Sequence, residues 1–161
     1  MVVVSRSSAC QIVPASIEHW RGWNRLFRAY ASFCHVDQAE RTLEIVWQWL
    51  LGSEHPLSGL IALDEVGEPA GIAHYRTIPQ SLTGNHSGFS DDLFVDSERR
   101  RQGVARALFT ALAHIGRSRG WCSLSWMTAE DNARTRTLYD QVATKTVYLT
   151  YRMALCTQHG R

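Results

Sequence analysis

A short turn rich in arginine separates an apolar segment from a run of small residues, and its composition suits a phosphate ligand. The apolar segment ends at Val95, and arginines precede Gly103. Apolar residues recur at helical spacing after Gly103, so a helix is predicted to begin there. The first turn of a helix leaves backbone N–H groups without acceptors and carries positive partial charge. Together with Arg100, Arg101 and Arg106, these groups would suit a diphosphate.

The turn matches neither of two common phosphate-binding signatures. GxxxxGK[ST] and GxGxxG are both absent from it. Gly103 and Ala105 are nevertheless small enough for phosphate oxygens to approach the backbone closely. The alternative is a solvated basic turn ahead of an amphipathic helix, and the turn alone leaves both interpretations open.

A second pair of residues, Asn132 and Tyr139, is spaced for one face of a helix. Seven residues make two helical turns, or about 10 Å along the axis. A phenol with a pKa of about 10 can give a proton or a hydrogen bond to a leaving group. The alternatives are that Asn132 only caps the helix and that Tyr139 is only a packed aromatic residue.

The hydrophobic pattern predicts the elements that position these residues, within one domain over residues 1–161. Strands are expected at about 9–14, 58–64, 70–78, 87–95, 122–127 and 146–155, with a loop at about 80–86. Two helices are expected between about 16 and 52, the second opened by Asp37 and Glu40, and two more at about 103–119 and 132–142. The third of these helices joins two strands, which should lie side by side or nearly so in one sheet.

The turn and the Asn–Tyr pair together resemble the GCN5-related N-acetyltransferase (GNAT) superfamily. Its signature [RQ]xxGx[GA] is matched by the run from Arg100 to Ala105, although many members carry glycine at the position of Arg101. The family also places Asn at a helix start and Tyr seven residues later, as Asn132 and Tyr139 stand here. The strings at 91–95 and 137–140 look most like bacterial members, compared with diamine and histone acetyltransferases.

The resemblance covers most of the chain, because the order of elements also matches. It implies an α/β fold (an α+β mixed sheet), with about six to seven strands flanked by about four helices. It also implies acetyl-CoA as co-substrate, with Tyr139 catalytic at the sulfur. The backbone of residues 93–95 would hold the pantetheine arm, and the turn would hold the pyrophosphate. The implied cofactor-binding residues are Leu93, Phe94, Val95, Arg100, Arg101, Gln102, Gly103, Val104, Ala105, Arg106, Asn132 and Tyr139.

The catalytic proton acceptor for the attacking amine is expected at Asp91. Diamine acetyltransferases carry a glutamate at this position, so the resemblance favours it. Adjacent strand residues face opposite sides, so only one of Asp91 and Asp92 is expected to point into the site. His74 and a water relay are alternatives, and a carboxylate that only neutralises nearby arginines is another. The backbone N–H of Val95 or Phe94 would stabilise the acetyl oxygen if the strand splays there.

Composition limits the classes of function. Hydrophobic residues make up 45% and charged residues 20% of the chain, and the net charge is +2. This excess is too small to predict a nucleic-acid or membrane surface, and no apolar stretch approaches the length of a membrane span. A soluble cytoplasmic protein is therefore expected. The four cysteines form no metal-ligand pattern, so no metal is expected, and they are predicted to be buried and reduced.

The expected function is direct transfer of the acetyl group to a primary amine in a ternary complex. The acceptor would be a small amine, a polyamine or a lysine-like group, bound as a small molecule or a peptide. The resemblance also suggests a homodimer. The alternative is a catalytically silent domain of the same fold that binds acyl-CoA or a partner protein. The first two helices carry aromatic residues that would either line an acceptor groove or form core: Trp20, Trp23, Phe27, Tyr30 and Trp47.

Overall fold

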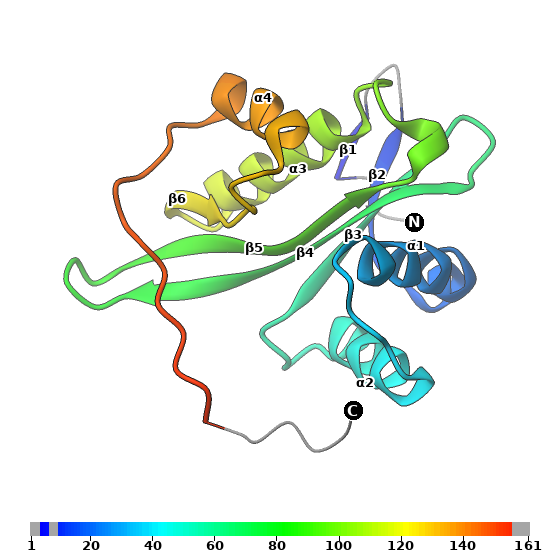
Figure 1. Ribbon diagram of the computed structural model, residues 1–161, viewed down its shortest axis with the longest axis horizontal. Coiled ribbons are helices and arrows are strands. Elements are labelled where there is room, and N and C mark those ends of the chain that lie inside the picture. Colours follow the sequence, from blue (N-terminus) through cyan, green and yellow to red (C-terminus); the bar gives the residue numbers. More distant parts are fainter. Residues whose placement is uncertain (1–3, 7–9, 156–161) are drawn as a thin grey trace. The chain divides into compact units, whose positions relative to one another are not determined.

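The computed structural model describes residues 4–6 and 10–155 and forms two compact units, Met1–Met127 and Thr128–Arg161 (Figure 1). The single domain expected over 1–161 stays a prediction. In chain order the first unit holds β1 (Ser5–Arg6), β2 (Gln11–Pro14), the short 3-10 helix η1 (Ile17–His19), α1 (Trp20–Phe33), α2 (Glu40–Leu51), β3 (Ser58–Leu63), β4 (Pro69–Gln80), β5 (Asn85–Val95), η2 (Ser97–Arg99), α3 (Val104–Ser118) and β6 (Trp121–Trp126). The second unit holds α4 (Ala133–Val142).

The described residues form one six-stranded sheet in the order β1-β2-β3-β4-β5-β6. Neighbouring strands from β1 to β5 are antiparallel, whereas β5 and β6 are parallel. A parallel pair needs a crossover, and α3 supplies it. This confirms the mixed α/β fold and the side-by-side placement of the two strands that α3 joins.

Helices cover both faces of the sheet in the first unit, with α1 and α2 on one side and α3 on the other (Figure 1). Adjacent residues of β4 show the two faces. A Cβ atom on Gly71 would lie 3.1 Å from a Val104 methyl group of α3, whereas Ile72 packs in a cluster with Trp23 of α1. Trp23, Phe27 and Trp47 are buried in that cluster. Trp23, Phe27 and Trp47 are therefore core, whereas Trp20 and Tyr30 are only partly buried, and their place in an acceptor groove stays a prediction.

Three expectations from the sequence are wrong. Residues 146–155 form no strand, although their apolar side chains alternate; Val147 is 91% exposed and Tyr151 is 89% exposed. An alternating pattern shows only that a segment could form a strand, and a strand also needs a neighbouring strand to pair with.

The N-cap of α2 is Ala39, and the capping box expected from Asp37 and Glu40 is not formed. Cys34 and Cys122 are exposed and only Cys10 is buried, while Cys156 lies outside the described residues.

Candidate active site

The end of β5 presents an open backbone edge. The Asp96 N–H donates to the Ala70 carbonyl at 2.9 Å, so the main-chain groups of the preceding residue, Val95, point away from β4. On the side of β5 that faces away from β4, β6 pairs with β5 only as far as Ser90. Beyond Ser90, this side of the β5 backbone has no strand partner in the described part of the chain. By the same alternation the N–H of Phe94 faces β4. Of the two backbone N–H groups expected as oxyanion donors, the N–H of Val95 points away from β4 and is available, whereas that of Phe94 is not.

Ion pairs and hydrogen bonds hold the turn after β5 in place. The Asp96 carboxylate accepts from Arg25 and from the backbone N–H of Glu98. The hydrogen bond from Arg25 is the main cause that lowers the pKa of Asp96. Arg99 pairs with Asp64 at 2.7 Å, and Arg100 Nε donates to the Val95 carbonyl at 3.3 Å. The turn is therefore anchored to the sheet before α3 begins.

Two residues of the turn adopt left-handed backbone conformations. Gly103, the N-cap of α3, has φ 84°, and Arg101 has φ 64°. Glycine takes this conformation without steric cost, whereas an L-residue with a side chain is strained in it. The glycine that many family members carry at the position of Arg101 fits the same backbone, so Arg101 keeps the shape of the turn at a cost in stability.

The first turn of α3 has no side-chain cap. Gly103 makes no capping hydrogen bond, and the first bond of the helix runs from Ala107 N–H to the Gly103 carbonyl at 2.9 Å. The N–H groups of residues 104–106 therefore have no acceptor within the helix. Arg101 and Arg106 are exposed beside them. An anion such as a diphosphate fits this combination of N–H groups, helix dipole and arginines.

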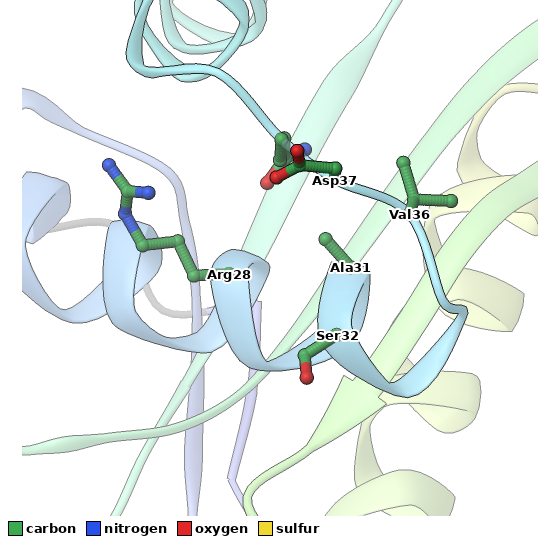
Figure 2. A pocket seen from close by; sticks show the side chains of 6 residues that line it. Arg28, Ala31, Ser32, Val36 and Asp37 are labelled. Atoms are coloured by element: carbon green, nitrogen blue, oxygen red, sulfur yellow. The ribbon is translucent and has the colours of Figure 1, made fainter. Parts of the chain in front are cut away.

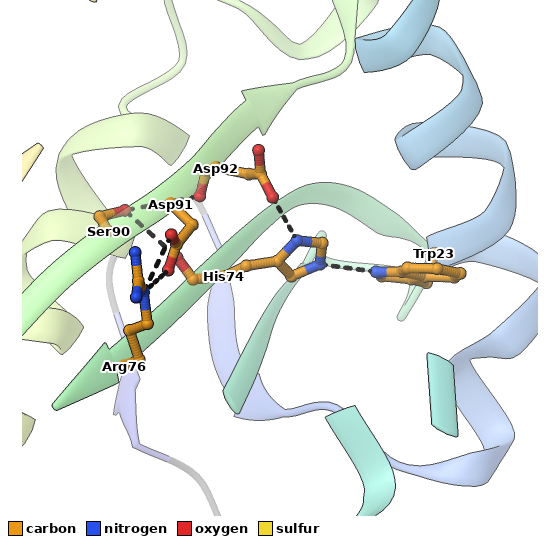
Figure 3. A network of polar contacts seen from close by, with 6 residues as sticks. All are labelled: Trp23, His74, Arg76, Ser90, Asp91 and Asp92. Carbon is orange, nitrogen blue, oxygen red and sulfur yellow. Dashed lines mark hydrogen bonds and ion pairs between the residues drawn. The ribbon is translucent and has the colours of Figure 1, made fainter. Parts of the chain in front are cut away.

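A β-bulge places two adjacent carboxylates on one face of the sheet (Figure 3). His74 lies opposite Asp92, but Tyr75 lies opposite Ser90, so Asp91 is the extra residue in β5. His74 and Arg76 are two residues apart on β4 and share a face. His74 contacts Asp92 and Arg76 contacts Asp91, so both carboxylates lie on that face. The strict alternation expected from the sequence does not hold here, because a bulge interrupts it.

The partners of the two carboxylates differ. Arg76 Nε donates to both oxygens of Asp91, at 3.1 and 3.0 Å, near the surface. The buried His74 ring lies between Asp92 and Trp23: its Nδ1 is 2.8 Å from Asp92 Oδ2, and its Nε2 accepts from Trp23 Nε1 at 2.8 Å. The sequence contained no signal for the contacts of Trp23 and Arg76, because each depends on tertiary packing between distant residues.

In the second unit, Asn132 is the N-cap of α4. Its side-chain oxygen accepts from Thr135 N–H at 3.4 Å, and its Nδ2 donates to Thr128 Oγ1 at 3.4 Å. The capping interpretation is therefore confirmed, while a contact with a cofactor stays a prediction. Tyr139 lies two turns further along α4 and is half-buried, and burial raises the pKa of its phenol above the ordinary value of 10.0. Tyr139 is therefore protonated at neutral pH.

A shallow pocket of about 270 Å³ lies at the end of α1 and the segment that follows it (Figure 2). It is not lined by any of the site residues expected from the sequence. The side-chain oxygen of Gln38 is buried there without a hydrogen-bond partner among the described residues. The lining residues are Arg28, Ala31, Ser32, Val36, Asp37 and Gln38.

Comparison with known proteins identifies the family. The sequence profile of the acetyltransferase (GNAT) family matches residues 20–143. The chain belongs to this family. A thialysine N-epsilon-acetyltransferase of Caenorhabditis elegans is 32% identical over 75 residues, which are 47% of this chain and 46% of that protein. The match thus spans about half the length of this curated relative.

Solved GNAT structures share the fold. A ribosomal-protein-alanine N-acetyltransferase from Brucella melitensis biovar Abortus 2308 superposes with a TM-score of 0.75 at 23% identity, covering 92% of this chain and 100% of that one. An aminoglycoside N-acetyltransferase in complex with CoA superposes with a TM-score of 0.79 at 19% identity, covering 94% and 98%. GNAT enzymes use acetyl-CoA, and the open edge of β5 followed by the uncapped start of α3 fits the pantetheine and pyrophosphate parts of that molecule.

Clusters of metal-binding side chains and membrane-spanning helices are both absent from the described residues. Among residues 4–6 and 10–155, no group of three or more His, Cys, Asp or Glu side chains is placed to hold a metal ion. Within the same ranges, no helix combines the length and the apolar character that a membrane crossing requires.

Proposed function

We propose that this GNAT protein is an N-acetyltransferase that moves the acetyl group of acetyl-CoA to a primary amine within a ternary complex. The observation that carries the proposal is the open edge of β5 at Val95, which leads through an anchored basic turn to the uncapped helix start at Gly103. A homodimer and a cytoplasmic location remain predictions.

The backbone groups and arginines of the first unit would bind the co-substrate. The outward N–H and C=O groups of Leu93 would pair with the amides of the pantetheine arm, as an added strand would, and the Val95 N–H would face the acetyl group. The N–H groups at the start of α3, with Arg101 and Arg106, would hold the pyrophosphate. The cofactor contacts assigned to Phe94, Arg100, Gln102, Val104, Ala105 and Asn132 belong to the same proposal.

The reaction needs the amine neutral and the sulfur protonated as it leaves. The acceptor ammonium first gives up one proton, and its nitrogen then attacks the carbonyl carbon of the thioester. When the C–S bond breaks, its electron pair stays on sulfur, and Tyr139 would give its phenolic proton to that thiolate. The Val95 N–H would stabilise the oxyanion formed in between. The nitrogen loses its second proton, and solvent restores the proton of Tyr139.

A lysine-like amine is the acceptor class that we propose to examine first. The curated relative is named for thialysine, and 32% of the 75 matched residues are identical. Two carboxylates on one face of the sheet would attract a cationic amine. Small diamines and polyamines present the same ammonium group and belong in the same assay.

Isothermal titration with acetyl-CoA tests the co-substrate, with CoA and free adenosine as controls. We expect acetyl-CoA and CoA to bind and adenosine to bind far more weakly, because it lacks the pyrophosphate and the pantetheine arm. Release of CoA thiol would then be followed with thialysine, lysine and 1,3-diaminopropane. No binding by a folded sample would refute the proposal, and binding without turnover of any amine would favour the silent acyl-CoA-binding domain.

A further inference from the structure

The two adjacent carboxylates of β5 are equally exposed but differ in what fixes them. The side chains of Asp91 and Asp92 are each 26% exposed. The partner of Asp91 is Arg76, which is 44% exposed, whereas the partner of Asp92 is His74, which is 1% exposed. Arg76 Nε donates to both oxygens of Asp91, whereas His74 contacts Asp92 at Oδ2.

The hydrogen bonds of His74 define its tautomer. Trp23 Nε1 can only donate, so His74 Nε2 must accept and carries no proton. A neutral imidazole then carries its proton on Nδ1 and donates it to Asp92 Oδ2. Protonation of Nε2 would set two donors against each other inside the core. Trp23 therefore fixes the tautomer in which His74 donates from Nδ1 to Asp92.

Packing makes this arrangement rigid. Trp23 is fully buried and stacks on Phe27 with ring centroids 4.9 Å apart, and it contacts Trp47 at 4.9 Å. Phe27 also meets the His74 ring edge to face at 5.0 Å. The indole cannot turn away without disrupting the core, so the orientation of His74, and through it that of Asp92, is fixed.

Other titratable or charged groups lie near Asp92 on α1, β4 and β5, and Arg100 lies in the turn that follows β5. On α1, Tyr30 lies near both Asp92 and Cys34; burial is the first cause that raises the pKa of Tyr30, and the charges of these two neighbours raise it further. On β4 and β5, the ion pair of Arg76 with Asp91 stands beside it. From the turn, Arg100 lies over the ring of Phe94, two residues along β5. Tyr30 stays protonated at neutral pH, so it does not compete for the proton.

We propose that Asp92, and not Asp91, takes the proton of the acceptor ammonium, with His74 and Trp23 as positioning residues. The inference rests on the proposed acetyl transfer. An Asp92 oxygen accepts one N–H proton, and the N–H electron pair stays on nitrogen, which then attacks the thioester carbon. After the C–S bond breaks, Asp92 releases its proton to solvent. Overall, an ammonium and a thioester become an amide, a thiol and one free proton.

Matched variants of the two carboxylates test the assignment, with acetyl-CoA and thialysine as substrates over a range of pH. Asp92→Asn should lower kcat by about 100-fold or more, as loss of a positioned base does, and should flatten the rise of kcat with pH. Asp91→Asn removes the ion pair with Arg76 and one of the two charges that would attract the amine, so it should raise the KM for thialysine and leave the pH dependence of kcat as in wild type. The opposite pattern, or unchanged profiles in both variants, would overturn the assignment.

Two variants of His74 separate positioning from packing. His74→Asn keeps an N–H donor near the place of Nδ1, whereas His74→Leu keeps only bulk. If His74 positions Asp92, the Leu variant should lose about tenfold or more in kcat at unchanged acetyl-CoA affinity, and the Asn variant should recover part of it. A packing role predicts equal activities for variants of equal thermal stability, and that result would remove His74 from the proposal.

Nitrogen NMR of the histidine side chains reads the tautomer without any acceptor amine. We expect the resonance that His74→Leu removes to report a proton on Nδ1, and Trp23→Phe, which removes the donor to Nε2, to make the Nε2-protonated tautomer detectable. A proton on Nε2 in the wild type would overturn the proposal. If wild type turns over no amine, the proposed function fails before any variant is compared, so the two failures are distinguishable.

Discussion

Helices α4 and α3 differ in how the unpaired backbone N–H groups of their first turns find acceptors. α4 begins at Asn132, whose side chain accepts from the N–H of Thr135. α3 begins at Gly103, which has no side chain and no capping bond. Helix α4 therefore supplies an acceptor for one of its own first N–H groups, whereas α3 leaves its first N–H groups open to an outside acceptor.

The difference shows which residues at a helix start point to a ligand. An Asn at an N-cap is explained by the cap alone, so its presence adds little to a functional argument. A glycine with φ 84°, placed after an anchored basic turn, is not explained by helix stability, because Gly103 provides no cap of its own. The uncapped start of α3 is therefore the stronger indication of a bound anion.

The largest effect is expected from Gly103→Glu. The substitution strains a left-handed position and sets a negative charge beside the pyrophosphate. Repulsion between charges about 4 Å apart costs about 1–4 kcal/mol between water and a protein surface, or roughly five- to a thousand-fold in affinity. Calorimetry should give an acetyl-CoA affinity at least about fivefold below that of wild type. Gly103→Asn tolerates the same backbone without the charge and should bind more tightly than the Glu variant; equal, wild-type affinity in both would move the pyrophosphate elsewhere.

Tyr139→Phe should give the next largest effect and acts on turnover instead of binding. Loss of one positioned acid should lower kcat by roughly ten- to a thousand-fold, with little change in acetyl-CoA affinity. Because burial raises the pKa of Tyr139 above 10.0, the active protonated form is lost only as pH rises beyond that value. Any fall of kcat in wild type caused by Tyr139 should lie above that pH and be absent from the Phe variant. Full activity of Tyr139→Phe would end its catalytic role.

Substitutions of Asn132 separate its confirmed cap from its proposed contact with the cofactor. Asn132→Ala removes the cap and should lower the stability of α4 by about 1 kcal/mol, measured by hydrogen exchange of its amides. Asn132→Ser keeps a capping oxygen and should preserve α4. If Asn132 also bonds the cofactor arm, the Ser variant should still lose about two- to tenfold in acetyl-CoA affinity, the value of one hydrogen bond. Unchanged affinity would leave Asn132 as a cap only.

Local sequence pattern was sufficient for most of the elements. The period of the apolar residues from Val104 to Ile115 predicts α3. Gly120 predicts its end, and α3 does stop two residues earlier, at Ser118. The signature from Arg100 to Ala105 located the turn because it depends on two local features, a glycine in a left-handed conformation and the start of a helix. Such features are encoded within a few residues, so they can be read without the rest of the chain.

Features that depend on distant partners could not be read in this way. The bulge at Asp91 exists only in the pairing of β5 with β4, and it overturned the alternation expected for the two carboxylates. The contact of Trp23 with His74 joins residues 51 positions apart. Residues 146–155 have the alternation of a strand but no ladder in the structure. In each case the deciding interaction lies outside the window in which the pattern is visible.

The smallest effect is expected from Arg101→Gly, which probes the turn that precedes the uncapped helix. Arg101 is exposed and has φ 64°. Glycine would relieve a left-handed strain of about 1–2 kcal/mol, offset by about 0.5–1 kcal/mol from its greater freedom in the unfolded chain. The net gain in the free energy of unfolding should be about 0.5–1 kcal/mol, measured by denaturant titration.

Arg101→Ala is the matched control, since it removes the same charge but keeps the strain. Acetyl-CoA affinity should fall equally in both variants if the guanidinium contacts the pyrophosphate, while only the Gly variant should be stabilised. Equal stability of the two would show that the left-handed conformation at Arg101 is not a source of strain, and the contrast between the two helix starts would then rest on Gly103 alone.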